Sequence, residues 1–179
     1  MKGVVFTHFM DLVEEAFGLD VLDRVIDTAE LQVPAAYTSV GTYPFEDLAS
    51  MLGQLSKEVQ VPPEDLLFAF GKYLFPKLIE GHPEIGGSLN SPLQLIHSVE
   101  DVIHVEVLKL YPDAELPKFE TEFEDENHLK VHYTSKRGLA DLAVGLIVAC
   151  GEHFEKPLVV ERDPDSSPDD ATFRISYAS

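Results

Sequence analysis

Residues 119–137 read FETEFEDENHLKVHYTSKR, and the side-chain character changes at almost every step along them. Because a β-strand turns alternate side chains to the same face, this pattern predicts two strands joined by a turn at EDEN. One face of the second strand then carries Leu129, Val131, Tyr133, Ser135 and Arg137. This row begins apolar and ends in hydrogen-bond donors that cover about 13 Å at about 3.3 Å per residue. Such a row suits a ligand that is apolar at one end and carries two anionic groups at the other.

The rest of the chain shows helical spacing before this hairpin and again after it. Apolar residues recur at that spacing in the segments 4–17, 21–29, 44–59, 61–81, 93–111 and 138–154, which we expect to be helices. Pro76 is expected to kink or shorten the helix that contains it. Alternation with period two returns in 157–162 and 172–177, which predicts two further strands. Helices followed by strands wrapped about one helix predict an α+β fold with an antiparallel sheet.

Length and composition favour one globular domain with a sizeable core, since the chain has 179 residues and is 45% hydrophobic. Its net charge of -19 disfavours binding to nucleic acid or to an anionic membrane, because the few basic residues are not clustered. Acidic residues interrupt the apolar N-terminal run, so we expect neither a signal peptide nor a membrane span there. A single cysteine, Cys150, excludes an internal disulfide. These features predict a cytoplasmic protein.

Motifs of the common enzyme classes are missing from the sequence. It contains no phosphate-binding glycine loop, nucleophile elbow, H-E-x-x-H or dinucleotide fingerprint, so we do not expect an enzyme. Acidic pairs are so frequent that solvated surface explains them better than a catalytic dyad. Cys150 lies on an apolar helical face and fits a core residue better than a nucleophile. No partner acid is set by spacing near His128 and His132, which disfavours a metal site at these residues.

His104 lies at the margin of an apolar helical stripe, which runs through Ile96, Val99, Ile103, Val107 and Leu110. This pattern alone favours a histidine at the edge of the core over a metal ligand. Taken together with the donor row on the second strand, however, a histidine in this position fits haem binding. Haem has an apolar macrocycle, two propionates and an iron that accepts a histidine. Arg137 would contribute about 1.5 to 3 kcal/mol to propionate binding. Lys136 falls on the opposite strand face and is expected to be solvated.

The spacing Y-x-S-x-R at Tyr133, Ser135 and Arg137, downstream of His104, resembles the hallmark of the haem-nitric oxide/oxygen binding (H-NOX) family. The stretches MKGVVF, FGKYLF, VIHVEVLKLYPDAELP and LAVGLI also occur in the family's order, so the resemblance covers essentially the whole chain. Within the family, the chain resembles the stand-alone bacterial members. The resemblance implies a helical N-terminal subdomain, about 1–62, packed on a subdomain of helices and sheet, about 63–179, with haem b between them.

The resemblance also implies roles for individual residues. His104 would be the axial ligand of the iron and its only protein ligand, and Pro117 would press on the haem face. The distal side would be lined by Val5, Phe9, Leu74, Phe75, Leu78, Leu142 and Leu146. Oxygen-binding members place a tyrosine where this chain has Leu142. Bound O₂ carries partial negative charge and gains from a donor, whereas bound NO gains little, so the resemblance implies a sensor selective for NO that also binds CO.

Many stand-alone bacterial members carry a cysteine-rich zinc site near the C-terminus, and DPDSSPDDATF stands in that region here. We expect no output domain in a chain of this length. The resemblance therefore implies signalling in trans, through loss of the bond from His104 to iron, to a histidine kinase or to a diguanylate cyclase or phosphodiesterase. One alternative is a haem-free helical interaction module that binds an anionic partner through YTSKR. Another is a haem enzyme, which is disfavoured because no distal histidine or arginine is evident.

Overall fold

The computed structural model describes residues 1–81 and 90–178, which fall into two compact units. The first unit is Met1–Phe70 and is helical, and the second is Gly71–Ser179 and combines helices with a sheet. The α+β class expected from the sequence is therefore confirmed. The boundary between the units lies within helix α4 (Pro63–Gly81), whereas the family resemblance implies a division of subdomains at about residue 62.

The first unit consists of helices packed through one apolar face each. They are α1 (Gly3–Phe17), α2 (Leu19–Thr28), α3 (Phe45–Val59) and the first part of α4. Gly18 separates α1 from α2 because it adopts a φ of 91°, a value that residues with a side chain rarely reach. The core of this unit contains Phe6, Phe9, Val13, Leu22, Val25, Leu48, Met51, Leu55 and Phe70.

Asp47, in the first turn of α3, has no solvent exposure and organises the loop that leads to this helix. Its Oδ1 accepts a hydrogen bond from the Gln32 backbone N–H at 2.8 Å, and its Oδ2 accepts from Val33 N–H at 3.3 Å and from the Tyr37 hydroxyl at 3.1 Å. A buried carboxylate is tolerated because these donors replace its water. Asp47 therefore serves the fold of the first unit.

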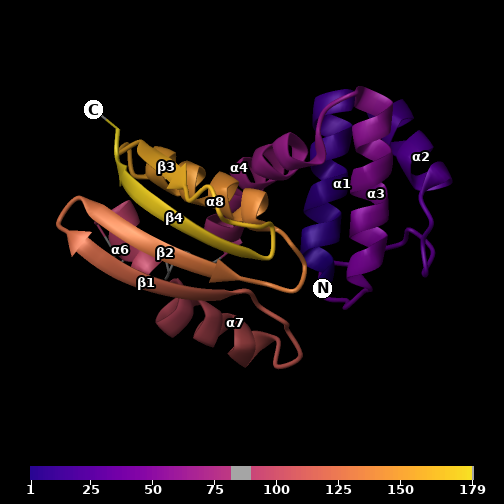
Figure 1. Cartoon of the computed structure of the whole chain (residues 1–179). Coiled ribbons are helices and arrows are strands. Elements are labelled where there is room, and N and C mark those ends of the chain that lie inside the picture. The colour runs from indigo at the N-terminus through magenta and orange to yellow at the C-terminus, as the bar shows by residue number, and fades with distance from the viewer. Residues whose placement is uncertain (82–89, 179) are drawn as a thin grey trace. The chain divides into compact units, whose positions relative to one another are not determined.

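The second unit is built on an antiparallel sheet with the strand order β1-β2-β4-β3 (Figure 1). The strands are β1 (Lys118–Asp125), β2 (His128–Thr134), β3 (Leu158–Arg162) and β4 (Asp170–Tyr177). Alternation with period two is confirmed on β2, where Leu129, Val131 and Tyr133 are buried and the residues between them face outward. The hairpin turn is shorter than predicted, because β2 already begins at His128.

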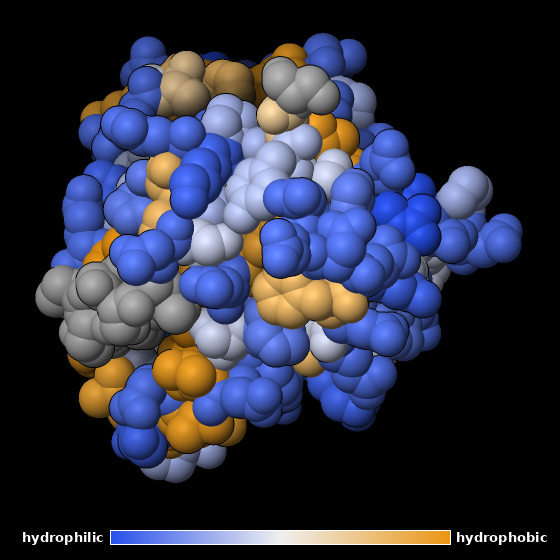
Figure 2. Space-filling view, turned by 90° about the vertical axis from the view of Figure 1, so that its left-hand side faces the viewer, coloured by the Kyte–Doolittle hydropathy of each residue, from blue (hydrophilic) through white to orange (hydrophobic). Residues whose placement is uncertain are grey.

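Helices cover the inner face of this sheet. These are α6 (Pro92–His97) and α8 (Ala140–His153), and their apolar residues form one core with β2 and β4. On the outer face the exposed positions are mostly charged, and hydrophilic residues dominate the side of the molecule shown in Figure 2. The strong acidity of the chain is thus carried by its surface.

The prediction of a single helix over residues 93–111 is wrong. The structure has α6, then a π-helix, η1 (Val99–Ile103), and then α7 (His104–Leu110). The His104 backbone N–H bonds to the carbonyl of Val99, five residues back, so the wide turn inserts an extra residue into the helical repeat. The apolar stripe predicted for one continuous helix, with about 3.6 residues per turn, is therefore out of phase beyond Ile103. Leu110, which that stripe placed on the apolar face, is 58% exposed. No residue of η1 or α7 is buried.

Helix α4 runs through Pro76 and continues to Gly81, so the proline does not shorten it. Within the second unit, α4 approaches α8 at Gly71. A Cβ placed on Gly71 would lie 2.3 Å from the carbonyl oxygen of Leu142 and 2.9 Å from the Cα of Gly145. Only glycine permits the two backbones to come this close, and their approach sets the spacing between the side chains of α4 and α8.

Gly71→Ala is expected to destabilise the protein by about 1 to 3 kcal/mol, because the added methyl group must displace the backbone of α8. Gly53→Ala, in the middle of α3, is the matched control, since a Cβ there has nothing within 4 Å. It should stabilise by about 0.5 to 1 kcal/mol through higher helix propensity. Urea unfolding of both variants measures this difference, and an equal gain for both would contradict the close approach of α4 and α8.

Candidate functional site

His104 is the first residue of α7, and its side chain is only 13% exposed. Its Nδ1 lies 3.2 Å from Oε2 of Glu100, one helical turn earlier. Burial lowers the pKa of His104 below its ordinary value, and the nearby Glu100 carboxylate opposes this shift only in part. The imidazole is therefore neutral near pH 7, with Nδ1 donating its hydrogen to the carboxylate. Within residues 1–81 and 90–178, its Nε2 has no hydrogen-bond partner and keeps a lone pair available for a metal.

An aromatic contact connects His104 with the motif on β2. The Phe119 ring centroid is 5.8 Å from that of His104 and 5.4 Å from that of Tyr133. Phe119 and Tyr133 are directly opposite each other in the register of β1 and β2. Tyr133 is 2% exposed, and burial raises its pKa against the opposing hydrogen bond with Ser135. The sequence did not identify Phe119, although it is the residue that brings the histidine and the motif together.

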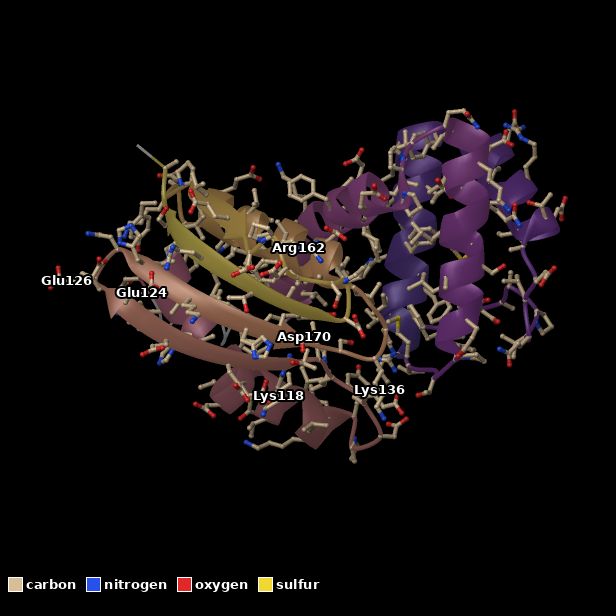
Figure 3. The ribbon with its side chains drawn as sticks, in the orientation of Figure 1. Lys118, Glu124, Glu126, Lys136, Arg162 and Asp170 are labelled. Atoms are coloured by element: carbon tan, nitrogen blue, oxygen red, sulfur yellow. The ribbon has the colours of Figure 1, made fainter. Side chains whose placement is uncertain are left out.

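The donor row predicted on β2 is only partly confirmed, because β2 ends at Thr134. Ser135 and Arg137 belong to a tight turn that closes at Gly138, where φ is 63°. Ser135 N–H donates to the carbonyl of Asp169 at 2.8 Å, and Arg137 N–H donates to the Ser135 hydroxyl at 3.3 Å. The turn, and not the pleat of a strand, therefore sets the direction of Arg137. Lys136 is exposed, as predicted, and is labelled in Figure 3.

The Arg137 side chain reaches back to the loop that follows α7. Its Nη1 donates to the carbonyl of Glu115 and its Nη2 to Oε2 of the same residue, both at 2.6 Å. The guanidinium side chain is 15% exposed, whereas the Glu115 side chain is 83% exposed. Because Glu115 is so exposed, its carboxylate can give up this position to another anion at low cost. Pro117 follows two residues later and is half-buried.

The predicted distal residues divide between the units. Leu74 and Phe75 on α4 and Leu142 on α8 are buried in the second unit, whereas Leu78 and Leu146 are half-buried. Val5 and Phe9 lie on α1 in the first unit, and their place in a shared pocket stays a prediction. In the second unit the residues fit haem: a neutral imidazole with one nitrogen available, an aromatic neighbour, and a turn that carries a partly buried guanidinium.

The other residues considered from the sequence have structural roles. His97 bonds the Thr121 hydroxyl through Nδ1 at 2.7 Å, and Cys150 is buried, which raises the pKa of its thiol to about 12. His128 and His132 each pair with one aspartate at 2.8 Å. In the described part of the chain, no group of three or more His, Cys, Asp or Glu is suited to hold a metal ion.

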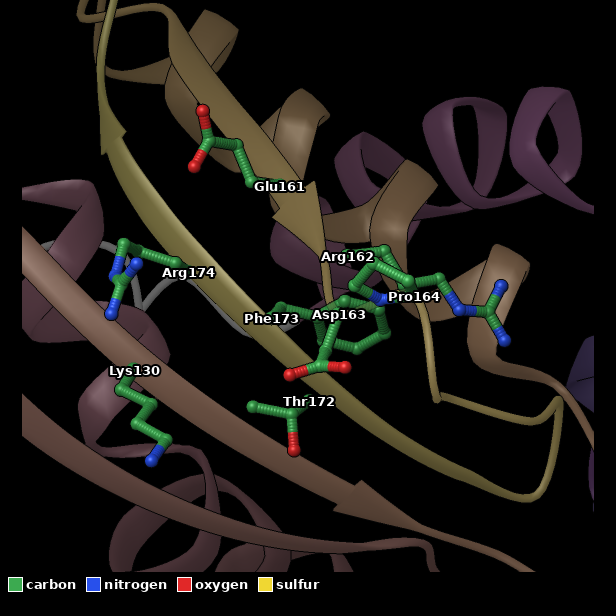
Figure 4. A pocket seen from close by; sticks show the side chains of 8 residues that line it. All are labelled: Lys130, Glu161, Arg162, Asp163, Pro164, Thr172, Phe173 and Arg174. Atoms are coloured by element: carbon green, nitrogen blue, oxygen red, sulfur yellow. The ribbon is translucent and has the colours of Figure 1, made fainter.

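A shallow depression lies on the outer face of the sheet, between β2, β4 and the end of β3 (Figure 4). Lys130, Thr172 and Arg174 contribute to its wall, together with Glu161 and Asp163. Arg174 is already paired with Glu124, at 2.8 and 3.0 Å. The depression contains none of the residues predicted to bind a ligand, so it is separate from the candidate site.

A family model described as haem-NO-binding (HNOB) matches residues 2–162. The chain belongs to this family. The HNOB family comprises haem-based gas sensors, so both the family and the class of cofactor expected from the sequence are confirmed. No curated protein matches the sequence. In the portion of the chain that the structure describes, no helix has the length and apolar character needed to cross a membrane.

Solved structures of H-NOX proteins agree closely with the fold. The Fe(II) unliganded protein from K. algicida is 35% identical, with a TM-score of 0.95 over 100% of this chain and 97% of that one. The protein from S. oneidensis in the Fe(II)NO state is 26% identical, with a TM-score of 0.91 over 100% of both chains. The protein from Shewanella woodyi in the Fe(II)CO state is 42% identical, with a TM-score of 0.84 over 99% of this chain and 95% of that one.

Arg137→Ala is expected to release haem faster, because a propionate would lose its charged partner, worth about 1.5 to 3 kcal/mol or roughly 10- to 150-fold in rate. Haem transfer to an acceptor globin, followed optically, measures this rate. Lys136→Ala should change it little, since that side chain is exposed.

Glu115→Ala serves as a second control, because it removes the ion pair seen here but leaves the guanidinium in place. It should not accelerate haem loss. If Glu115→Ala and Arg137→Ala released haem equally fast, the contribution of Arg137 would lie in anchoring the loop and not in binding a propionate.

Proposed function

We propose that this HNOB protein is a sensor selective for NO, which holds haem b through His104 and reports ligand binding to a separate signalling protein. His104, which is partly buried and neutral, is the main support for this proposal. Its Nδ1 is hydrogen-bonded to Glu100, and its Nε2 remains available to bind a metal. As an iron ligand, this nitrogen would hold the cofactor, and Tyr133, Ser135 and Arg137 would supply hydrogen-bond donors to it.

Haem b, the non-covalent form, is supported by the cysteine content of the chain. Covalent attachment of a c-type haem uses a C-x-x-C-H motif, whereas this sequence has the single Cys150. That cysteine is 2% exposed and lies within 3.8 Å of the Pro92 carbonyl oxygen, in the core of the second unit. The cofactor would therefore be held by His104, by apolar contacts and by the donors of Tyr133, Ser135 and Arg137.

Selectivity for NO is supported by the apolar character of the residues proposed for the distal side. Leu142 and Leu146 on α8, and Leu74, Phe75 and Leu78 on α4, have no hydrogen-bond donor in their side chains. Bound O₂ is polar and gains from such a donor, whereas bound NO gains little. The S. oneidensis and S. woodyi relatives were solved with NO and CO respectively, and we propose the same two gases as ligands of this chain.

A conformational output is supported by the packing of the segment that carries His104. The π-helix η1 precedes it directly, and neither η1 nor α7 has a buried residue. Segments with few buried contacts open at low free-energy cost, and π-helical turns are frequent at functional sites. We propose that loss of the bond between His104 and iron on NO binding releases η1 and α7, and that a histidine kinase or a cyclic-di-GMP enzyme responds in trans.

His104→Ala is expected to abolish stable haem binding, with free imidazole partly restoring the spectrum because it can occupy the vacated ligand position. Absorption spectra of the purified variants, with and without imidazole, measure this. His97→Ala is the control, since His97 is bonded to Thr121 and should leave the Soret band unchanged. Loss of haem from the His97 variant instead would show that the wrong histidine has been assigned.

The unmutated ferrous protein is expected to bind NO and CO but to form no stable O₂ complex in air. Rapid mixing with air-saturated buffer, followed optically, tests this directly. A persistent oxy spectrum would contradict NO selectivity, because it would require a donor on the distal side. Leu142→Tyr adds one donor, and a hydrogen bond of about 0.5 to 1.5 kcal/mol corresponds to roughly a two- to twelvefold gain in O₂ affinity.

A further inference from the structure

One carboxylate oxygen joins His104 to the sheet. Oε2 of Glu100 lies 3.2 Å from Nδ1 of His104 and also accepts a hydrogen bond of 3.0 Å from the backbone N–H of Phe119. The first of these groups belongs to α7 and the second to β1, while Glu100 itself is in η1. The oxygen therefore bridges the helix that carries the histidine and the strand beside it.

This geometry differs from an ordinary pair of charged residues on a helix surface. An exposed pair four residues apart contributes little to stability and can move freely in water. Here the His104 side chain is 13% exposed and that of Glu100 is 41% exposed, but the carboxylate is held by the N–H of Phe119, whose ring also packs on the imidazole. The carboxylate thus has a defined position relative to both the ring and the strand.

A fixed acceptor at Nδ1 has two consequences for a histidine that ligates a metal. It selects the tautomer that carries hydrogen on Nδ1, so that Nε2 points its lone pair at the metal, and it sets the rotation of the ring. A negatively charged acceptor also makes the imidazole more basic and hence a stronger ligand.

We propose that Glu100 is a positioning residue for His104, which sets the strength of the bond between His104 and the haem iron and ties the histidine to β1. This inference rests on the proposed function, since it assumes that His104 is the ligand. The strength of the bond between His104 and iron decides how readily NO displaces the histidine. Because Glu100 sets that strength, it controls how readily the protein responds to NO.

Two substitutions separate the charge of Glu100 from its hydrogen bonds. Glu100→Gln keeps an acceptor oxygen for Phe119 N–H but removes the negative charge, whereas Glu100→Ala removes both. Asp101→Asn is the matched control, because it makes the same change of charge at the next residue of η1, which is exposed.

Resonance Raman spectroscopy of the ferrous unliganded proteins measures the iron–histidine stretching frequency. It should fall from the unmutated protein to Glu100→Gln and again to Glu100→Ala, and stay constant in Asp101→Asn. Haem loss should rise about tenfold or more for Glu100→Ala, the range typical of residues that support a metal ligand. A residue needed only for folding would change thermal stability without this graded shift in frequency.

The outcomes distinguish the two proposals. If the unmutated protein shows no iron–histidine band, the assignment of His104 as the ligand fails. If that band is present and has the same frequency in both Glu100 variants, His104 stands as the ligand and the role of Glu100 is overturned. In haem-free protein, ¹⁵N spectra of the imidazole supply a second readout: hydrogen should reside mainly on Nδ1 in the unmutated chain and lose that preference in Glu100→Ala.

Discussion

The contact of Phe119 with both His104 and Tyr133 is the interaction on which the candidate site depends. Phe119 is the second residue of β1 and faces the helices, so its ring meets the imidazole on one side and the tyrosine on the other, while its backbone N–H holds Glu100. Phe119 thereby connects the start of α7 to Tyr133 on β2. The histidine is therefore positioned by the sheet as much as by its own helix.

The segments around that contact differ strongly in how far their side chains are buried. Residues of β2, β4 and α8 form a well-buried core, and Leu129, Val131, Phe173 and Ile175 have no solvent exposure at all. The segment η1 and α7 has none of this burial and leaves several apolar side chains more than 40% exposed, including Val102, Val105 and Leu108. Under the proposed function, a well-buried core beside a segment with few buried residues would allow a local event at His104 to move that segment without unfolding the unit.

Because the chain is strongly acidic and has few basic residues, the carboxylate partner of each basic side chain affects whether that side chain can bind an anionic ligand. Most of the basic side chains in the second unit are matched by nearby carboxylates, as Arg174 is by Glu124 and Arg162 by Asp141. Arg137 differs in that its guanidinium is mostly shielded while its carboxylate partner, Glu115, is almost fully exposed. Because an exposed partner adds little, this arginine is suited to accept an anionic ligand in its place.

The sequence by itself determined the fold class, the alternation on β2, the helix α8 and the order of His104 before Tyr133, Ser135 and Arg137, because these follow from local periodicity and residue type. It also indicated the family. Only the tertiary structure decided where β2 ends, how the predicted long helix divides around η1, and that Glu100 bonds both His104 and Phe119. The physical reason is that periodicity records which residues are apolar and how they are spaced. A π-turn, the end of a strand and a shared carboxylate oxygen depend instead on hydrogen bonds whose partners, such as Val99 with His104 and Glu100 with Phe119, are chosen by packing.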